Sequence, residues 1–334
     1  MISTDIQNSV LITGGAGFIG SNLCDFFIEK NYKVVCLDNF STGSYHNISH
    51  LVSNPNFTLI EGDIRNLSTC EAAVKNIDYV LHHAALGSVP RSINNPILTN
   101  EVNISGFLNV LVASRDAKVK RFIYAASSST YGDSASLPKM EEVIGKPLSP
   151  YAITKYVNEL YADIFSKTYG MQTIGLRYFN VFGRRQNPEG AYAAVIPKFI
   201  NAFLRHESPI INGDGNYSRD FTYIDNVLQM NELAILTENP KAVNTVYNTA
   251  FGERTTLNEL TEIIKQSLIN IDKDINNIAI LYQDNRAGDI PHSLADIQKA
   301  KNLLNYNPQY SLKQGIEESI GWYFQNFNNV KINL

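Results

Sequence analysis

The stretch Val10-Leu11-Ile12-Thr13-Gly14-Gly15-Ala16-Gly17-Phe18-Ile19-Gly20 decides the fold. It opens as a short apolar run typical of a buried strand and ends in a segment with apolar residues at helical spacing. Gly14 permits a tight turn, Gly17 lets the backbone approach a pyrophosphate, and Gly20 lets the helix pack closely on the strand. The amino end of the helix, where Phe18 and Ile19 lie, supplies unpaired N–H groups that bind an anion. The stretch therefore predicts a dinucleotide-binding turn.

Acidic and small residues at the ends of later expected strands indicate which dinucleotide is bound. Asp38 ends the second expected strand, 18 residues beyond Gly20. A carboxylate at this place accepts hydrogen bonds from the adenosine ribose and repels a 2′-phosphate, so we predict NAD rather than NADP. Asp63 ends the third strand, where it either contacts the adenine amino group or only caps the strand end. Ala84 and Ala85 follow the fourth strand and let a flat cofactor lie close.

The amino-terminal half alternates short apolar runs with amphipathic stretches, and this rhythm loosens past about residue 180. Such alternation predicts a parallel sheet with helices on both faces and a ligand site at the carboxyl ends of the strands. We therefore predict an α/β fold, with a Rossmann-type doubly wound parallel sheet over residues 1–180 and a smaller mixed α/β substrate lobe over 181–334, with some chain crossing between them. Strands are expected at 10–12, 33–37, 58–60, 79–82, 121–126 and 173–177. Helices are expected at 17–30, 68–76, 97–117, 151–169, 193–205, 225–236, 256–268 and 312–327.

The composition argues against several classes of function. The 334 residues include 28 basic and 32 acidic side chains, for a net charge of −4 and a pI near 5.9, which argues against nucleic-acid or polybasic membrane binding. The three cysteines match neither a disulfide framework nor a zinc pattern, so we expect no metal and a reducing, cytoplasmic compartment. No cationic region precedes an apolar stretch at the amino terminus, and no run of about 18 apolar residues occurs, so we expect neither a signal peptide nor a membrane span.

Tyr151 and Lys155 form a candidate acid–base pair. Ser149 suits a helix N-cap and Pro150 a first helical position, so Tyr151 and Lys155, four residues apart, lie on one helix face. An ammonium group beside a phenol favours the phenolate. Lowering a tyrosine pKa from about 10 to about 7 requires roughly 4 kcal/mol, which one desolvated cation and a cationic nicotinamide supply in a closed site. A serine run at the end of an expected strand offers a hydroxyl to a substrate oxygen beside Tyr151. Its members are Ser127, Ser128 and Ser129.

Taken in order, these motifs resemble those of the extended short-chain dehydrogenase/reductase family, and specifically of nucleotide-sugar 4-epimerases. The match runs from about residue 9 to about residue 325, and the segment 85–92 resembles bacterial UDP-N-acetylglucosamine 4-epimerases of surface-polysaccharide pathways. The motifs that carry the resemblance are Gly14-x-x-Gly17-x-x-Gly20, Asp38-Asn39-Phe40-Ser41-Thr42-Gly43, Gly62-Asp63-Ile64-Arg65, His83-Ala84-Ala85, the serine run with Tyr131-Gly132, Tyr151-x-x-x-Lys155, Arg177-Tyr178-Phe179-Asn180-Val181-Phe182-Gly183, Arg219-Asp220-Phe221 and Arg286-x-Gly288-Asp289.

The resemblance implies a reaction and a set of residue roles. Tyr151 takes the proton of the hydroxyl on sugar carbon 4, Ser127 or else Ser128 polarises that hydroxyl, and Lys155 lowers the pKa of Tyr151 and holds the nicotinamide ribose. A hydride moves from carbon 4 to NAD, the 4-keto sugar turns about its link to the diphosphate, and the returning hydride inverts the hydroxyl. Further cofactor contacts are implied for Asn39, Ser41, Thr42, Gly43, Ile64 and Tyr178. Substrate contacts are implied for Ser88, Arg91, Ser129, Asn180, Ala194, Val195, Arg219, Arg286 and Asp289.

Within this set the two arginines at 219 and 286 are expected to clamp the diphosphate, because an arginine fork suits paired phosphate oxygens. On the residues alone, the alternative for Arg219 is a surface ion pair with Asp220. The residue at 293 bears on the choice of sugar. By the resemblance, epimerases restricted to non-acetylated hexoses carry tyrosine at the place of Ser293, and serine leaves space for a 2-acetamido group. We therefore predict interconversion of UDP-GlcNAc and UDP-GalNAc, with UDP-glucose and UDP-galactose as further substrates.

Three other functions stay open. An epimerase of UDP-N-acetylhexosaminuronic acids is plausible because Arg91 or a serine would meet a carboxylate on carbon 5. A 4,6-dehydratase has an Asp-Glu pair where Ser128-Ser129 stand here, and a non-catalytic NAD-sensing module loses the tyrosine or the lysine of the pair. The resemblance also implies a homodimer, built through the helices expected at 97–117 and 151–169.

Overall fold

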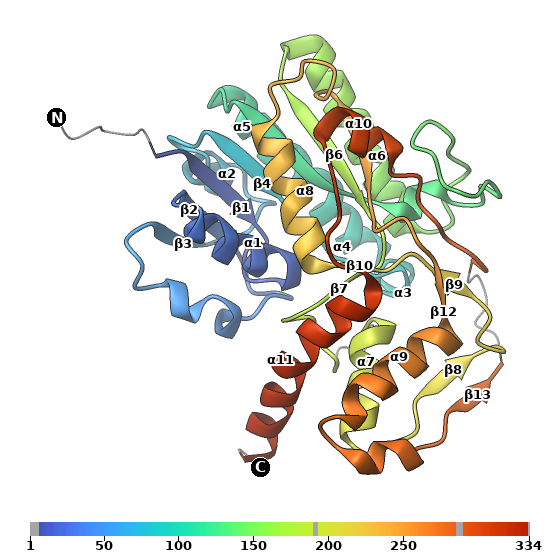
Figure 1. Ribbon diagram of the computed structural model, residues 1–334. Coiled ribbons are helices and arrows are strands. Elements are labelled where there is room, and N and C mark those ends of the chain that lie inside the picture. The colour runs from blue at the N-terminus through green and yellow to red at the C-terminus, as the bar shows by residue number, and fades with distance from the viewer. Residues whose placement is uncertain (1–6, 190–192, 285–289, 333–334) are drawn as a thin grey trace.

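The computed structural model describes residues 7–189, 193–284 and 290–332, and a seven-stranded sheet forms its centre (Figure 1). The strand order is β11-β6-β5-β4-β1-β2-β3, and every neighbouring pair is parallel. This arrangement confirms the predicted α/β fold with a doubly wound parallel sheet. The strands are β1 (Ser9–Thr13), β2 (Lys33–Asp38), β3 (Phe57–Glu61), β4 (Tyr79–His82), β5 (Arg121–Ser127), β6 (Thr173–Tyr178) and β11 (Thr245–Thr249).

Helices cover both faces of the sheet (Figure 1). On one face, α1 (Phe18–Glu29) and α8 (Ile224–Leu236) pack against each other and bury an apolar cluster with the strands. On the other face, α2 (Leu67–Ala73), α5 (Phe107–Asp116) and α6 (Pro150–Tyr169) bury a second cluster. The helix expected at 97–117 consists of α4 (Pro96–Asn100), a π-helical segment (Glu101–Gly106) and α5.

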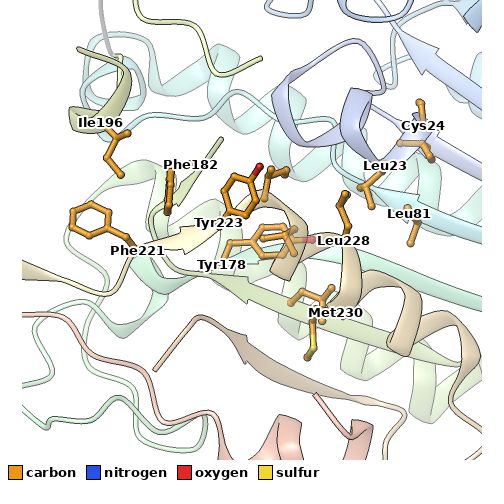
Figure 2. Close-up of a cluster of buried hydrophobic side chains, with 14 of the residues drawn as sticks. Leu23, Cys24, Leu81, Tyr178, Phe182, Ile196, Phe221, Tyr223, Leu228 and Met230 are labelled. Carbon is orange, nitrogen blue, oxygen red and sulfur yellow. The ribbon is translucent and has the colours of Figure 1, made fainter. Parts of the chain in front are cut away.

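The first of these clusters continues from the sheet toward the second lobe. Figure 2 shows Tyr178, Phe182, Tyr223 and Leu228 gathered where the end of β6 meets α8. Two short strands, β7 (Val181–Phe182) and β10 (Thr222–Tyr223), pair in parallel at this place. The apolar packing is therefore continuous between the sheet and the smaller lobe. It holds the segment after β6 against the edge of the sheet at which the strands have their carboxyl ends.

The smaller lobe lies below the sheet at the right in Figure 1 and contains α7, α9, β8 and β13. The chain crosses between the two parts, because α8 and β11 return to the main sheet before α9 begins. The elements not yet given are α3 (Val89–Asn94), α7 (Val195–Leu204), β8 (Ile210–Asn212), β9 (Ser218–Arg219), β12 (Thr255–Thr256), α9 (Leu257–Ile269), β13 (Leu281–Gln283), α10 (Gln298–Leu304), α11 (Leu312–Ile332), and 3-10 turns at Tyr45–Asn47, Ser49–Leu51, Ser128–Tyr131 and Lys273–Asn277. Among the described helices, none is both long and apolar enough to cross a membrane.

Candidate active site

A cleft of about 390 Å³ runs along the carboxyl ends of β1 to β6. This is the edge at which open α/β sheets bind their ligands. Eighteen of the predicted site residues line it: Gly14, Gly17, Phe18, Ile19, Gly20, Asp38, Asn39, Ser41, Thr42, Asp63, Ile64, Ala84, Ala85, Ser127, Tyr151, Lys155, Tyr178 and Asn180. The structure thus brings predicted site residues from Gly14 to Asn180 into a single cleft.

The glycine turn has the close backbone approaches that its spacing predicts. Gly14 has φ +69°, and a Cβ atom there would lie 2.8 Å from the amide nitrogen of Ala84. A Cβ atom on Gly20 would lie 2.1 Å from the carbonyl oxygen of Gly14, which no side chain tolerates. Among the described side chains, none caps the amino end of α1 at Gly17. The turn and the helix end therefore fit a pyrophosphate, as an NAD site requires.

Two carboxylates at the ends of β2 and β3 line the part of the cleft that the sequence argument assigns to adenosine. The buried Asp38 accepts hydrogen bonds from the N–H groups of Ala16 (2.9 Å) and Phe40 (2.8 Å), so it is held against the glycine turn. Asp63 accepts from Arg65 Nη2 (2.7 Å) and Asn39 Nδ2 (2.9 Å). The hydrogen bonds from Arg65 lower the pKa of Asp63 to about 2, so Asp63 is charged at neutral pH.

The helix α6 presents Tyr151 and Lys155 to the cleft from its first two turns. Ser149 Oγ accepts from the N–H of Ala152 (3.1 Å), and Gly170 ends the helix with φ +68°, so both ends follow ordinary capping rules. A contact from another segment also fixes the helix start, because Ser92 Oγ accepts from the backbone N–H of Tyr151 (3.0 Å). The position of Tyr151 is therefore set by its own helix and by α3.

The electrostatics of this pair differ in one respect from the sequence argument. Lys155 Nζ donates to the carbonyl oxygen of Ala125 (2.8 Å), and burial lowers the pKa of Lys155 to about 8. Burial also raises the pKa of Tyr151, and the nearby Ser127 hydroxyl lowers that pKa by a smaller amount. Desolvation thus has the largest effect on the Tyr151 pKa, and Lys155 does not produce the expected depression of that pKa in the protein alone. The cationic nicotinamide included in the sequence argument is the group that acts in the opposite direction.

The three serines of the run take different positions. Ser127 lies at the end of β5, lines the cleft, and caps the 3-10 turn Ser128–Tyr131. Ser129 donates to Ser127 Oγ from its backbone N–H (3.2 Å) and its hydroxyl (2.9 Å). Ser128 and Ser129 are not among the lining residues. The geometry therefore favours Ser127 over Ser128 as the serine next to Tyr151.

His83 joins the site although the sequence argument gave it no role. Its Nε2 lies 2.8 Å from the hydroxyl of Tyr178, which also accepts a hydrogen bond from Asn231 Nδ2 (2.9 Å). Burial lowers the pKa of His83 to about 3, so the ring is neutral at physiological pH. The only signal for it in the sequence is its place before Ala84. Other lining residues that sequence reasoning did not name as site residues are Leu37, Gly62, Leu86, Gly87, Val102, Ala125, Ala126 and Val181.

Two predicted substrate residues of the smaller lobe, Arg219 and Ser293, lie close to each other but beyond the cleft lining. Arg219 Nη1 donates to the carbonyl oxygens of Ser218 (3.0 Å) and Pro291 (3.1 Å), and the N–H of Ser293 donates to Ser218 O (3.0 Å). Asn180 links this region to the cleft, because its Nδ2 donates to the carbonyl oxygen of Asp220 (2.9 Å). The carboxylate of Asp220 accepts hydrogen bonds from the backbone N–H groups of Phe251, Gly252 and Ala295.

The remaining predicted site residues that the structure describes do not line the cleft. Val195, in the first turn of α7 after Ala194, lines a second cavity of about 360 Å³. Ser88 caps α3 with φ +92°, and Arg91 lies within α3; neither lines the cleft. Gly43 packs against Ala16 outside the lining. Arg286 and Asp289 lie outside the described residues. Within the described part of the chain, no cluster of three or more His, Cys, Asp or Glu side chains has the arrangement of a metal site.

Comparisons with known proteins agree with this geometry. Residues 10–250 match the NAD dependent epimerase/dehydratase family. A putative UDP-glucose 4-epimerase of Methanocaldococcus jannaschii is 38% identical over 319 residues, which cover 95% of this chain and 99% of the relative. The solved UDP-N-acetylglucosamine 4-epimerase of Methanobrevibacter ruminantium M1, in complex with UDP-N-acetylmuramic acid, is 39% identical with a TM-score of 0.88 and coverage of 96% and 99%.

A UDP-glucose 4-epimerase of Thermotoga maritima, solved with UDP-glucose, is 36% identical with a TM-score of 0.87 and coverage of 95% and 99%. Other matches are named UDP-glucuronate 4-epimerase or dTDP-glucose 4,6-dehydratase, so the similarity spans several sugars. The chain belongs to the NAD dependent epimerase/dehydratase family, which confirms the family, the enzyme class and the NAD cofactor that its sequence motifs predict.

Proposed function

We propose that the protein is a UDP-N-acetylglucosamine 4-epimerase that interconverts UDP-GlcNAc and UDP-GalNAc through a transient 4-keto sugar, and that it also accepts UDP-glucose and UDP-galactose. The observation that carries the proposal is the convergence of Tyr151, Lys155 and Ser127 in the same cleft as the glycine turn. NAD, when bound, accepts a hydride from the sugar and returns it. No net redox change results, so the reaction needs a cofactor that stays in place.

Each residue of the triad has a defined task in this proposal. Tyr151 takes the proton from the hydroxyl on carbon 4 and later returns a proton to the same oxygen. Ser127, which lines the same cleft as Tyr151, donates to that oxygen as its charge develops. Lys155 is held by the carbonyl of Ala125 (2.8 Å) and presents its remaining N–H bonds to the nicotinamide ribose. A general base in such a place contributes about 10²- to 10⁴-fold to the rate.

Inversion requires a firmly held nucleotide and a sugar that is free to turn. Arg219 is oriented by two carbonyl oxygens, from Ser218 and Pro291, and is proposed to bind the diphosphate. The cavity beside Val195 and Phe199 is proposed to receive the uracil, with Ala194 at its edge. Arg286 and Asp289 are assigned to the diphosphate and the uridine ribose by the resemblance alone. The two cavities together suit an elongated nucleotide sugar next to NAD.

The preference for acetylated sugars rests on Ser293. Its backbone N–H donates to the carbonyl oxygen of Ser218, and by the resemblance a tyrosine ring at this place would take the space needed by the 2-acetamido group. The test assays UDP-GlcNAc, UDP-GalNAc, UDP-glucose and UDP-galactose with the wild type, with Ser293→Tyr, and with Ser53→Tyr as an exposed control. We expect Ser293→Tyr to lose activity on the acetylated pair far more than on the plain pair. Equal losses on both pairs would contradict the steric argument, and absence of any epimerisation by the wild type would contradict the function.

A second candidate is a 4-epimerase of UDP-N-acetylhexosaminuronic acids, because a relative named UDP-glucuronate 4-epimerase is 32% identical over 331 residues. Arg91 lies in α3, the helix whose Ser92 contacts the backbone of Tyr151. A carboxylate on carbon 5 would find a cation in this helix. Adding a UDP-hexosaminuronic acid to the substrate panel, with the Arg91→Gln variant, separates the two candidates: selective loss of the uronic activity in the variant favours the second.

We further propose a cytoplasmic homodimer that acts in surface-polysaccharide biosynthesis. The three cysteines are buried free thiols, which suits a reducing compartment. Ile153, Leu160 and Ile164 project from one side of α6, and Ile97 of the adjoining α4 is 72% exposed, so an apolar surface lies where the sequence predicts a partner. Light scattering should report a dimer for the wild type and a monomer for Ile153→Glu/Ile164→Glu. A monomeric wild type would contradict this proposal.

A further inference from the structure

Arg177 of β6 is a buried cation that contacts α6, the helix that carries Tyr151 and Lys155. Its Nε donates to Glu159 Oε1 (2.8 Å) and its Nη2 to Glu159 Oε2 (2.7 Å), and the two side chains are only 3% and 7% exposed. The third donor, Nη1, binds the carbonyl oxygen of Glu141 (2.9 Å). Two parallel hydrogen bonds fix the orientation of the partners as well as their separation. The guanidinium therefore holds Glu159 in one place relative to the sheet.

Glu159 lies on the same helix as the proposed acid–base pair. It follows Lys155 by four residues and Tyr151 by eight, so the three side chains project from one face of α6 in successive turns. A bidentate contact at the third position fixes both the rotation of α6 about its axis and its position along that axis. The ion pair therefore determines how far Tyr151 and Lys155 reach into the cleft.

The same guanidinium also contacts the segment that carries Ser127. Its central carbon lies 4.9 Å from the centre of the Tyr131 ring, a cation–π contact. Tyr131 ends the 3-10 turn that Ser127 caps, and its hydroxyl donates to Asn248 Oδ1 of β11 (2.6 Å). One side chain, Arg177, thus touches the helix of Tyr151 through Glu159 and the turn of Ser127 through Tyr131.

We propose that Arg177, Glu159 and Tyr131 form a positioning unit that holds Ser127 and Tyr151 in their places in the cleft. The proposal rests on the function proposed above, since it concerns the same two hydroxyls, and none of the three residues lines the cleft. Stability alone is a weak reason for such a pair, because the cost of desolvating two charges offsets their attraction. A bidentate ion pair fixes the orientation and the separation of its two partners, which an apolar contact does not.

The test compares three proteins as purified holoenzymes. Glu159→Gln keeps the size of the side chain and removes its charge. The double variant Arg177→Met/Glu159→Leu replaces the pair by apolar side chains, which buried ion pairs commonly tolerate without loss of folding. Asp163→Asn is the matched control, because Asp163 lies one turn further along α6 and forms an exposed ion pair with Lys167.

We expect both Glu159 variants to lower kcat by about 10²-fold, as a displacement of about 1 Å at reacting groups does. KM for the UDP-sugar and the content of bound NAD should stay close to those of the wild type. The acid limb of the kcat profile should move to higher pH, because the Ser127 hydroxyl, which lowers the pKa of Tyr151, is displaced from it. Asp163→Asn should show none of these changes.

Hydrogen–deuterium exchange supplies a readout that does not depend on activity. Peptides covering 127–132 and 150–160 should exchange faster in both Glu159 variants than in the control. Wild-type kcat, pH profile and exchange in the double variant would overturn the proposal, even if Glu159→Gln failed to fold. A wild type without epimerase activity but with the expected exchange pattern would overturn the proposed function and leave the positioning unit standing.

Discussion

Asp220 is a buried carboxylate whose replacement should change how stability depends on pH. Its side chain is fully buried and accepts hydrogen bonds from the N–H groups of Phe251 (3.2 Å), Gly252 (3.1 Å) and Ala295 (3.2 Å). These bonds favour the ionised form, but burial has the larger effect and the charge of Glu253 adds to it. The pKa of Asp220 is therefore raised from 3.8 to about 7.

The sign of the effect follows from proton binding. Between about pH 4 and pH 7 the folded protein keeps a proton on Asp220 that the unfolded chain has released, so stability falls as pH rises through this window. The contribution is fully present below the unfolded pKa of 3.8 and is lost once the pH passes about 7. At 1.36 kcal/mol per pH unit the total is about 4 kcal/mol. Asp220→Asn removes this titration and should flatten the curve by that amount.

Urea unfolding between pH 4.5 and pH 8, followed by the fluorescence of the single tryptophan, Trp322, measures the difference. The matched control is Asp274→Asn, at an exposed position of the Lys273–Asn277 turn. As the pH rises, the unfolding free energy of Asp220→Asn should increase relative to that of the wild type. The unfolding free energy of Asp274→Asn should keep a constant difference from that of the wild type. Parallel curves for Asp220→Asn would refute the reasoning.

Three further substitutions test the site itself. Tyr151→Phe should lower kcat by about 10² to 10⁴ with NAD still bound, and a near-normal rate would remove this tyrosine from the mechanism. Ser127→Ala should lower kcat more than Ser128→Ala, because only Ser127 lines the cleft; the reverse order would reassign the role. Gly20→Ala places a Cβ atom 2.1 Å from Gly14 O and should yield protein without NAD, measured by chromatography of the released nucleotide. Normal NAD content in that variant would contradict the packing argument.

Much of the fold could be predicted because it depends on local rules. The glycine spacing, the apolar runs and the caps at Ser149 and Gly170 act within a few residues of chain, so the strands from β1 to β6 and the helix α6 lie close to their expected positions. The strand β11 was not predicted. Its sequence, Thr245-Val246-Tyr247-Asn248-Thr249, contains three polar residues, and only pairing with β6 makes it part of the sheet. The polar side chains of Asn248 and Thr249 are buried there by their neighbours.

By itself the sequence determined the fold class, the NAD-binding turn and the family. Each of these depends on interactions between residues close together in the chain or on motifs of fixed spacing. The tertiary structure alone decided that Ser127 rather than Ser128 lines the cleft, that Asp220 turns toward backbone N–H groups, and that His83 meets Tyr178. It also decided that burial has the largest effect on the pKa of Tyr151 and raises it. These outcomes depend on distances between segments far apart in the chain and on exclusion of water, and neither quantity exists until the chain has folded.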